Sequence, residues 1–346
     1  MHEPLHAQQE RRRLFHLAVN SAIASLLLLG LTTVGAAPTK GGAIRPTQTI
    51  PLPDVEGRID HLAVDVNGKR LFVCALGNNS LEVIDLQRGE RIHAITALGS
   101  PQGVAYSNES SRLYVANENG GRCNIYDGHS FAPLGVVDFK DDADNVRYDR
   151  SSKRVYVGYG EGGIGVIDAE SGRNIGSLKL AQHPEAFVLE QNGPRIFVNV
   201  PTTHEVAVID RAQGKVIATW KTDGAFANFP MALDESNHRL FLGCRLPAKL
   251  VVLNTDSGAV VATLSIAGDP DDVFYDEKNH RVYAICGAGA IEVIDQLDRD
   301  SYQMTATIKT ASGARTGLFV PELSSLFVAV PHRGAQTAEI RRYTVQ

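Results

Sequence analysis

The sequence lacks the short motifs that mark the common catalytic and cofactor sites. It contains no GxSxG nucleophile elbow, no HExxH zinc motif, and no glycine-rich phosphate loop between a strand and a helix. None of its four cysteines forms CxxC or CxxCH, which excludes c-type haem attachment and zinc-ribbon spacing. No helical periodicity of any length follows the N-terminal region. These absences leave a chain that must be interpreted from its strands.

Excess positive charge and a second long hydrophobic run are also missing. The formal net charge is −5 at pH 7, and no basic block or stripe occurs after the first forty residues. Because nucleic-acid partners are held through phosphate contacts with basic residues, we expect no nucleic-acid partner. No segment beyond the N-terminal region is hydrophobic enough to span a bilayer, so we expect no stable membrane insertion once that region is removed.

The N-terminal residues 1–36 have the pattern of a signal peptide. Three arginines at 11–13 precede an apolar run over 14–34, and small residues follow, with cleavage expected near Ala36. This predicts a periplasmic or secreted bacterial protein. The Arg12-Arg13 pair followed by Leu14-Phe15 also resembles a twin-arginine signal. The alternative is an uncleaved membrane anchor, since the run could just cross a bilayer.

A short strand motif recurs along the rest of the chain. Its first apolar residue follows an arginine in six of seven copies, and successive copies are 41 to 44 residues apart. The seven anchor residues are Leu71, Leu113, Val155, Ile196, Leu240, Val282 and Leu326. Runs such as "LFVCA", "LYVAN" and "VYVGY" are rich in β-formers. A fixed period of this length is typical of a repeat architecture.

Each repeat contains the pattern of a four-stranded meander. A second strand ends in motifs such as "VID", a polar turn and a third strand follow, and another strand precedes each anchor. That preceding strand usually ends in an acid, such as Asp65 or Asp149, whose expected role is turn formation. Stacking such units radially buries the faces between them. The sequence therefore predicts an all-β, seven-bladed β-propeller with four-stranded antiparallel blades, forming one domain over residues 37–346.

Closure of the ring is expected to involve both ends of this domain. The last repeat contains only three strands, whereas residues 44–53 offer a spare one before the first repeat. We expect this N-terminal strand to complete and close the last blade. The alternative is that residues 37–54 form a loose arm.

The repeats resemble a known family. "RLYVAN" and "RVYVGY", followed by "VID" and "SG" turns, are similar to the YVTN-repeat β-propellers, which are exported proteins of bacteria and archaea. The resemblance covers residues 44–346 and implies the propeller fold, but most members have no assigned function. Streptogramin lyases and bacterial lactonases share the fold, although their catalytic residues do not map onto this sequence. A single tryptophan, Trp220, argues against the tryptophan-docked packing of quinoprotein propellers.

The loops that lead into the innermost strand of each repeat, here called the inner loops, contain the candidate site residues. They differ between repeats and are rich in polar side chains: "RIDH", "SPQG", "DDADN", "HPEA", "NFPM", "DPDD" and "GART". In a closed ring they converge on one mouth of the central channel. The expected ligand-binding residues are Asp60, His61, Gln102, Asp144, Asn145, His183, Glu185, Asp271 and Arg315.

Four of these acids form a candidate metal site. Carboxylates held close together raise one another's pKa unless a cation lies between them. Asp60, Asp144, Glu185 and Asp271 are therefore predicted ligands of a divalent cation, calcium, magnesium or manganese, although no cofactor is certain. The alternative is that the acids only cap turns and solvate the channel. A further possibility is that Arg315 and Arg147 hold a carboxylate or phosphate group.

Two functions remain open from the sequence. The first is an exported binding module, monomeric, whose channel mouth recognises a small molecule, peptide or partner protein. The second is a metal-dependent lyase, lactonase or hydrolase at the same mouth, in which His61 or His183 moves the proton. The four cysteines Cys74, Cys123, Cys244 and Cys286 permit three pairings. Cys244 and Cys286 occupy equivalent strands about 10 Å apart, and we expect them to be unbonded.

Overall fold

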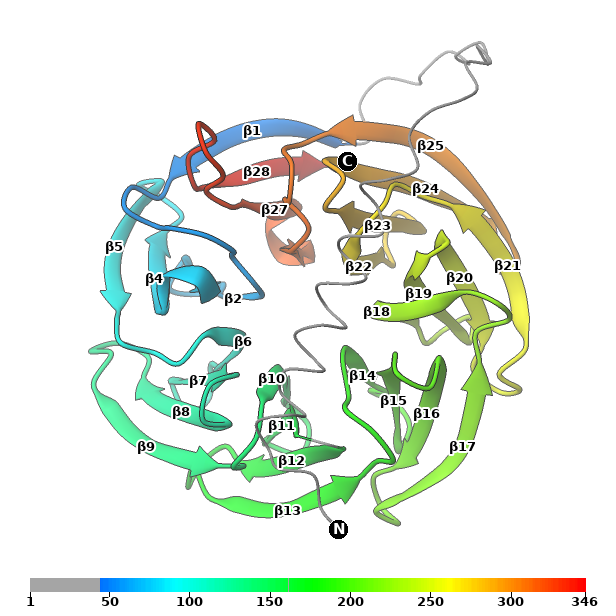
Figure 1. Cartoon of the computed structure of the whole chain (residues 1–346), viewed down its shortest axis with the longest axis horizontal. Coiled ribbons are helices and arrows are strands. Elements are labelled where there is room, and N and C mark those ends of the chain that lie inside the picture. The colour runs from blue at the N-terminus through cyan, green and yellow to red at the C-terminus, as the bar shows by residue number, and fades with distance from the viewer. Residues whose placement is uncertain (1–43, 161) are drawn as a thin grey trace. The chain divides into compact units, whose positions relative to one another are not determined.

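The computed structural model describes residues 44–160 and 162–346. The predicted signal peptide 1–36, and the predicted start of the propeller domain at residue 37, lie outside the described residues. Within the described residues the chain forms seven four-stranded antiparallel sheets arranged around a central axis (Figure 1). The predicted all-β, seven-bladed β-propeller is confirmed.

Each of the first six blades is a meander that runs from the central axis outward. Blade 1 comprises β2 Leu62–Asp65, β3 Arg70–Ala75, β4 Ser80–Asp85 and β5 Glu90–Ile95. Blade 2 comprises β6 Pro101–Ser107, β7 Arg112–Asn117, β8 Arg122–Asp127 and β9 Pro133–Asp138. Blade 3 comprises β10 Ala143–Asp149, β11 Arg154–Tyr159, β12 Gly163–Asp168 and β13 Asn174–Lys179. Blade 4 comprises β14 Phe187–Leu189, β15 Arg195–Val200, β16 Glu205–Asp210 and β17 Lys215–Lys221. Blade 5 comprises β18 Phe226–Asp234, β19 Arg239–Leu246, β20 Ala248–Asn254 and β21 Val260–Ser265. Blade 6 comprises β22 Pro270–Asp276, β23 Arg281–Cys286, β24 Ala290–Asp298 and β25 Ser301–Lys309.

The seventh blade joins the two ends of the domain. It contains β26 Gly317–Val320, β27 Ser325–Val330, β28 Glu339–Val345 and, as its outermost strand, β1 Ile44–Pro51. β1 pairs antiparallel with β28, and Ile50 lies opposite Ile340. The predicted closure of the last blade by the N-terminal strand is therefore confirmed. Two short 3-10 helices, η2 Leu76–Asn78 and η3 Pro321–Leu323, lie in the connections of blades 1 and 7.

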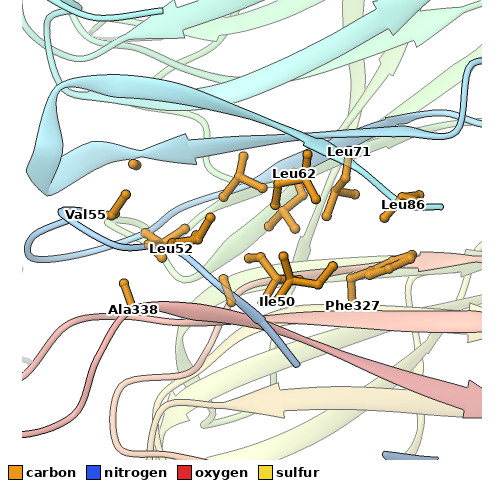
Figure 2. Packing of buried hydrophobic residues seen from close by; sticks show 14 of the residues in the cluster. Ile50, Leu52, Val55, Leu62, Leu71, Leu86, Phe327 and Ala338 are labelled. Atoms are coloured by element: carbon orange, nitrogen blue, oxygen red, sulfur yellow. The ribbon is translucent and has the colours of Figure 1, made fainter. Parts of the chain in front are cut away.

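The core lies between neighbouring blades. All seven anchor residues of the repeat have no exposed surface, because the second strand of each blade is covered on both faces. Figure 2 shows the cluster between blades 7 and 1, where Ile50 and Phe327 pack near Leu62 and Leu71. Burial at these interfaces supplies the hydrophobic free energy that a lone blade could not obtain.

In blades 1 and 4, the arginine before the anchor contacts the next blade. Arg70 forms an ion pair with Asp65, at 2.6 Å from Nη2 to Oδ2, and donates to the carbonyl oxygen of Gly128 in the next blade. Asp65 also accepts a hydrogen bond from the backbone N–H of Gly68, which closes the turn between β2 and β3. Asp65 thus forms the predicted turn, and in blade 4 Arg195 pairs with Glu190 in the same way, at 2.5 Å from Nη2 to Oε1.

The innermost strands surround a channel. β2, β6, β10, β14, β18, β22 and β26 each contact the innermost strands of both neighbouring blades. They line a cavity of about 1310 Å³. All four cysteines are buried and free, so Cys244 and Cys286 are unbonded as predicted. No helix in the described part of the chain has the length and apolar character needed to cross a membrane.

Candidate functional site

The inner loops and the first residues of the innermost strands form one mouth of the channel. Gln102 is the second residue of β6, Asp144 and Asn145 are the second and third of β10, and Asp271 is the second of β22. The remaining predicted residues lie in the inner loops before β2, β14 and β26: Asp60, His61, His183, Glu185 and Arg315. The fifth blade contributes Arg245 instead, from the end of β19. All of these side chains are buried or half-buried.

Asp271 lies in an arginine-rich half of the mouth. Arg315 Nε is 2.8 Å from Asp271 Oδ2, and Arg245 Nη2 donates a hydrogen bond to Asp271 Oδ1. The same two arginines contact Asp269, at 3.1 Å from Arg315 Nη1 and 3.2 Å from Arg245 Nε. Burial alone would raise the pKa of Asp271, but the positive charges of Arg315, Arg245 and Arg58 outweigh it and hold the pKa well below the usual value. Asp271 is therefore ionised and compensated.

Arg245 is placed by an aromatic ring as well as by the two aspartates. Its guanidinium carbon lies 3.8 Å from the centre of the Phe229 ring, and its Nε donates to the carbonyl oxygen of Pro270 at 3.2 Å. Only 5% of its surface is exposed. A buried arginine with this many partners is rigid, which favours a structural role in shaping this half of the mouth.

Asp60 is also paired with an arginine. Arg58 Nη2 is 2.8 Å from Asp60 Oδ2 and 3.9 Å from Asp271 Oδ2, so it links the two carboxylates. Asp60 is almost fully buried, whereas Arg58 is exposed. The side chain of Arg58 therefore covers Asp60 from the solvent side.

His61 lies between carboxylates near the centre of the mouth. Its Nδ1 is 3.5 Å from Asp272 Oδ1, and its Nε2 is 3.8 Å from Asp60 Oδ1. Burial lowers the pKa of His61, but the negative charges of Asp272, Asp60 and Asp144 have a larger combined effect and raise it to about 10. His61 is therefore an imidazolium at neutral pH and cannot accept a proton as a general base.

The opposite half of the mouth contains a cluster with metal-binding geometry. One ligand atom each from Asp144, His183 and Glu185 lies within 4.8 Å of the others. His183 Nδ1 is 2.6 Å from the carbonyl oxygen of Gly160. Because a carbonyl only accepts, Nδ1 carries the hydrogen and Nε2 carries the lone pair of the neutral ring. A backbone hydrogen bond of this kind is how metal-binding histidines are usually oriented.

The electrostatics of this half differ from those of the arginine-rich half. Burial, together with the charge of Asp60, raises the pKa of Asp144 to about 8, although His61 opposes the shift. Burial and the charges of Asp144 and Asp271 raise the pKa of Glu185 well above its usual value. Both carboxyl groups thus lack the positive charge that would allow them to ionise fully at neutral pH.

Two amides order the edge of this acidic half. Gln102 Nε2 donates to Asp142 Oδ1 at 3.1 Å. Asn145 lies between Asp144 and Arg147, since its Nδ2 is 3.4 Å from Asp144 Oδ1 and its Oδ1 accepts from Arg147 Nη2 at 3.0 Å. These contacts place Gln102 and Asn145 in supporting positions beside the carboxyl groups.

The grouping differs from the four-carboxylate metal site expected from the sequence. Asp60 and Asp271 are each bound by arginines, whereas Asp144 and Glu185 are joined by His183. Asp60 and Asp271 were predicted to be metal ligands because their negative charges had no known cation nearby. The arginines supply that positive charge. Of the four predicted metal ligands, Asp144 and Glu185 remain in a grouping suited to a cation.

Sequence reasoning did not select four residues that shape the mouth: Arg245, Asp142, Asp269 and Asp272. The three aspartates occupy aligned inner-loop positions, in "DDADN" and "DPDD", so the charge density of these loops was the available signal. Arg245 belongs to "CRLPAK", which replaces the usual polar turn of the repeat. That departure from the repeat was a signal, but only the fold shows that Arg245 lies against Asp271.

Comparison with known proteins identifies the fold. Kuenenia stuttgartiensis hydrazine synthase is similar with a TM-score of 0.72 and 16% identity, over 80% of this chain and 93% of that chain. A chain of the mitotic checkpoint complex has a TM-score of 0.74 and 15% identity, over 93% of this chain and 99% of that chain. U3-55K has a TM-score of 0.75 and 11% identity, over 89% of this chain and 100% of that chain. No protein-family model and no curated protein matches the sequence. At these identities the likeness shows the fold alone: the chain is a seven-bladed β-propeller.

Proposed function

We propose that this chain is an exported binding module of the YVTN-repeat type, and that the mouth formed by its inner loops recognises a small molecule, peptide or partner protein through a cationic group. The pattern of residues 1–36 and the repeat motifs support the exported, bacterial character. The negative net charge argues against a nucleic-acid partner. We also propose that the protein acts as a monomer.

The observation that carries the proposal is the uneven compensation of charge across the mouth. The carboxylates of Asp60, Asp269 and Asp271 are bound by arginines. Burial and neighbouring carboxylates raise the pKa values of Asp144 and Glu185, and neither group takes part in an ion pair with an arginine among the described residues. A ligand that brings a positive charge to these two carboxyl groups lets them ionise and forms charge-assisted hydrogen bonds in a poorly solvated site.

A second candidate function follows from the geometry of Asp144, His183 and Glu185. Two carboxylates and one imidazole within 4.8 Å of one another suit manganese and, less well, magnesium or calcium, which prefer oxygen ligands. A bound divalent cation would supply Lewis-acid chemistry for a lyase, lactonase or hydrolase. His61 is held protonated beside Asp272, so in such an enzyme it would serve as a proton donor.

One experiment separates the two candidates. The mature chain is purified, its metal content is measured, and its thermal melting is compared after EDTA treatment and after addition of manganese, calcium or an organic cation such as spermidine. A ligand that binds the native state raises the melting temperature. Copurified metal and a rise with manganese support the metal-dependent function. A rise with the organic cation in the presence of EDTA supports the binding module.

The matched variants are Glu185→Gln and, as a control on the solvated surface, Glu170→Gln. Glu185→Gln removes the ionisable group from the mouth, so the rise in melting temperature produced by either type of cation should fall by at least half. Glu170 is exposed and pairs with Lys153, so its replacement should leave the ligand response intact. If neither metal nor organic cation shifts the wild-type melting temperature, the mouth does not bind cations and both candidates fail in this form.

A further inference from the structure

One ring of equivalent positions in the channel contains a single cation among apolar side chains. The residue eight positions before each anchor lies opposite an aromatic residue of the second strand, as Arg147 lies opposite Tyr156. At the same register position the other six blades have only apolar residues: Ala63, Ala105, Val188, Ala232, Phe274 and Leu318. All seven residues line the cavity of about 1310 Å³. Arg147 is therefore the exception in a ring of equivalent positions.

Arg147 is held in place without a carboxylate partner. Its Nη1 donates to the carbonyl oxygen of Val146 at 2.9 Å, and its Nη2 donates to Asn145 Oδ1 at 3.0 Å. Its guanidinium carbon lies 5.6 Å from the centre of the Phe187 ring in the next blade. It takes part in none of the ion pairs found among the described residues, although most arginines around the mouth do. A guanidinium has five N–H donors, so donors remain for a ligand.

The other charged groups at this end of the cavity nearly cancel. His61 and Asp272 both line it, and their side chains face each other at 3.5 Å. Burial lowers the pKa of Arg147, and the more distant Asp272 and Asp144 offset only part of this effect. Arg147 is thus a buried positive charge without an ion-pair partner among the described residues, and an anion placed beside it would reduce the cost of its burial.

The cavity reaches the opposite face of the propeller from the mouth. It extends from His61 and Asp272 to the turns between first and second strands, where Glu190 and Glu235 lie. Glu190 is paired with Arg195 at 2.5 Å, and Glu235 accepts the backbone N–H groups of residues 191 and 192. Asp234, which also lines this end, accepts hydrogen bonds from the side-chain amides of Asn237 and Gln296. Glu277 lines it as well, so an anion that enters from this face passes acidic side chains before it reaches Arg147.

We propose that the channel is a second binding site, adjoining the mouth but distinct from its acidic cluster, for an amphipathic monocarboxylate: the carboxylate pairs with Arg147 and an aliphatic or aromatic body lies along the apolar ring. A guanidinium binds a carboxylate through two parallel hydrogen bonds, which gives both strength and orientation. An apolar cavity with few placed polar groups is the usual form of a small-molecule site. The proposal does not depend on cation binding at the mouth.

The test uses octanoate as the probe and 1-octanol as its neutral counterpart, with binding measured by isothermal titration calorimetry on the mature chain. Octanoate should bind with one-to-one stoichiometry. The variant Arg147→Met places an apolar side chain where the other blades have one, and it should weaken octanoate binding at least tenfold while leaving octanol binding unchanged. Arg147→Lys keeps the charge but loses the two parallel hydrogen bonds, so its affinity should be intermediate.

The matched control is Arg122→Met, which removes one arginine from the exposed start of β8. It should bind octanoate as the wild type does. The proposal is overturned if the wild type fails to bind octanoate at millimolar concentration, or if Arg147→Met binds it with unchanged affinity. If Arg147→Met does not fold, Arg147→Lys and the difference between octanoate and octanol on the wild type decide the question.

Discussion

At the scale of single residues, the mouth shows that neighbouring acids in one cluster have different states. Asp271 and Asp144 are both buried, yet the pKa of Asp271 is lowered and that of Asp144 is raised to about 8. The difference lies in the partners: guanidinium groups surround Asp271, whereas Asp144 faces another carboxylate, Asp60. Burial therefore favours the neutral form only where no positive charge is placed alongside.

The raised pKa of Asp144 predicts a dependence of stability on pH. In the unfolded chain the carboxyl group of Asp144 ionises at about pH 3.9, whereas in the folded protein it stays protonated to about pH 8. Between these two pH values the native state binds more protons than the unfolded state. The contribution of Asp144 to stability is therefore complete below pH 4 and is lost as the pH rises to 8. The variant Asp144→Asn lacks this loss. At pH 8 and in EDTA it should be more stable than the wild type by about 1–3 kcal/mol.

The measurement is urea unfolding of wild type and variant between pH 4 and pH 8. The two should have similar stability near pH 4 and diverge as the pH rises. Asp223→Asn serves as the control, because Asp223 is exposed and its replacement should not change the pH dependence. Parallel curves for wild type and Asp144→Asn would show that Asp144 is already ionised in the folded protein.

At the scale of elements, β1 has a role that differs from that of the other outermost strands. It is the only strand of the described chain that pairs with a blade distant in sequence, since β1 and β28 come from opposite ends of the domain. Ile50 is fully buried and packs in the cluster between blades 7 and 1 (Figure 2). The ring is therefore closed by backbone hydrogen bonds and apolar burial together.

Shortening Ile50 tests this closure. Ile50→Ala removes buried methyl groups and leaves a cavity, so the free energy of unfolding should fall by about 2–4 kcal/mol. Thr49→Ala, at the adjacent exposed position of the same strand, should change it by less than about 0.5 kcal/mol. Urea unfolding followed by circular dichroism measures both. An equal, small effect of the two variants would mean that β1 does not contribute to the closed ring in solution.

Most of the elements could be predicted because their signals are local. Alternation of apolar residues marks a strand, and the regular spacing of the seven anchors marks the repeat. The pairing of β1 with β28 could also be inferred, because the last repeat lacks one strand. The partner of Arg245 could not, because Asp271 lies in the next repeat, 26 residues further along the chain. No local pattern encodes a contact between side chains of two blades.

At the scale of the whole molecule, each blade buries both of its faces against neighbours. The described chain exposes large apolar side chains mainly on outermost strands, such as Leu134 and Val136 of β9 and Ile175 of β13. Scattered exposed apolar residues are ordinary on a monomer. This distribution is in keeping with the proposed monomer.

A monomer has a melting temperature that does not depend on its concentration. If the protein is the monomer proposed above, the value should be the same over about a hundredfold range of protein concentration. Differential scanning fluorimetry measures the melting temperature, and light scattering after size-exclusion chromatography measures the molecular mass. A melting temperature that rises with concentration, together with a dimer mass, would identify the apolar side chains of β9 and β13 as an interface.

The sequence by itself determined the number of blades, the order of their strands and the closing partner of the last one. These follow from short-range alternation and from a period that repeats, and both are written along the chain. Only the tertiary structure decided which charges meet: Asp271 with Arg245 and Arg315, and Asp144 with His183 and Glu185. Those pairings depend on how seven sheets pack around one axis and on where each side chain then points. That geometry arises from all the blades together.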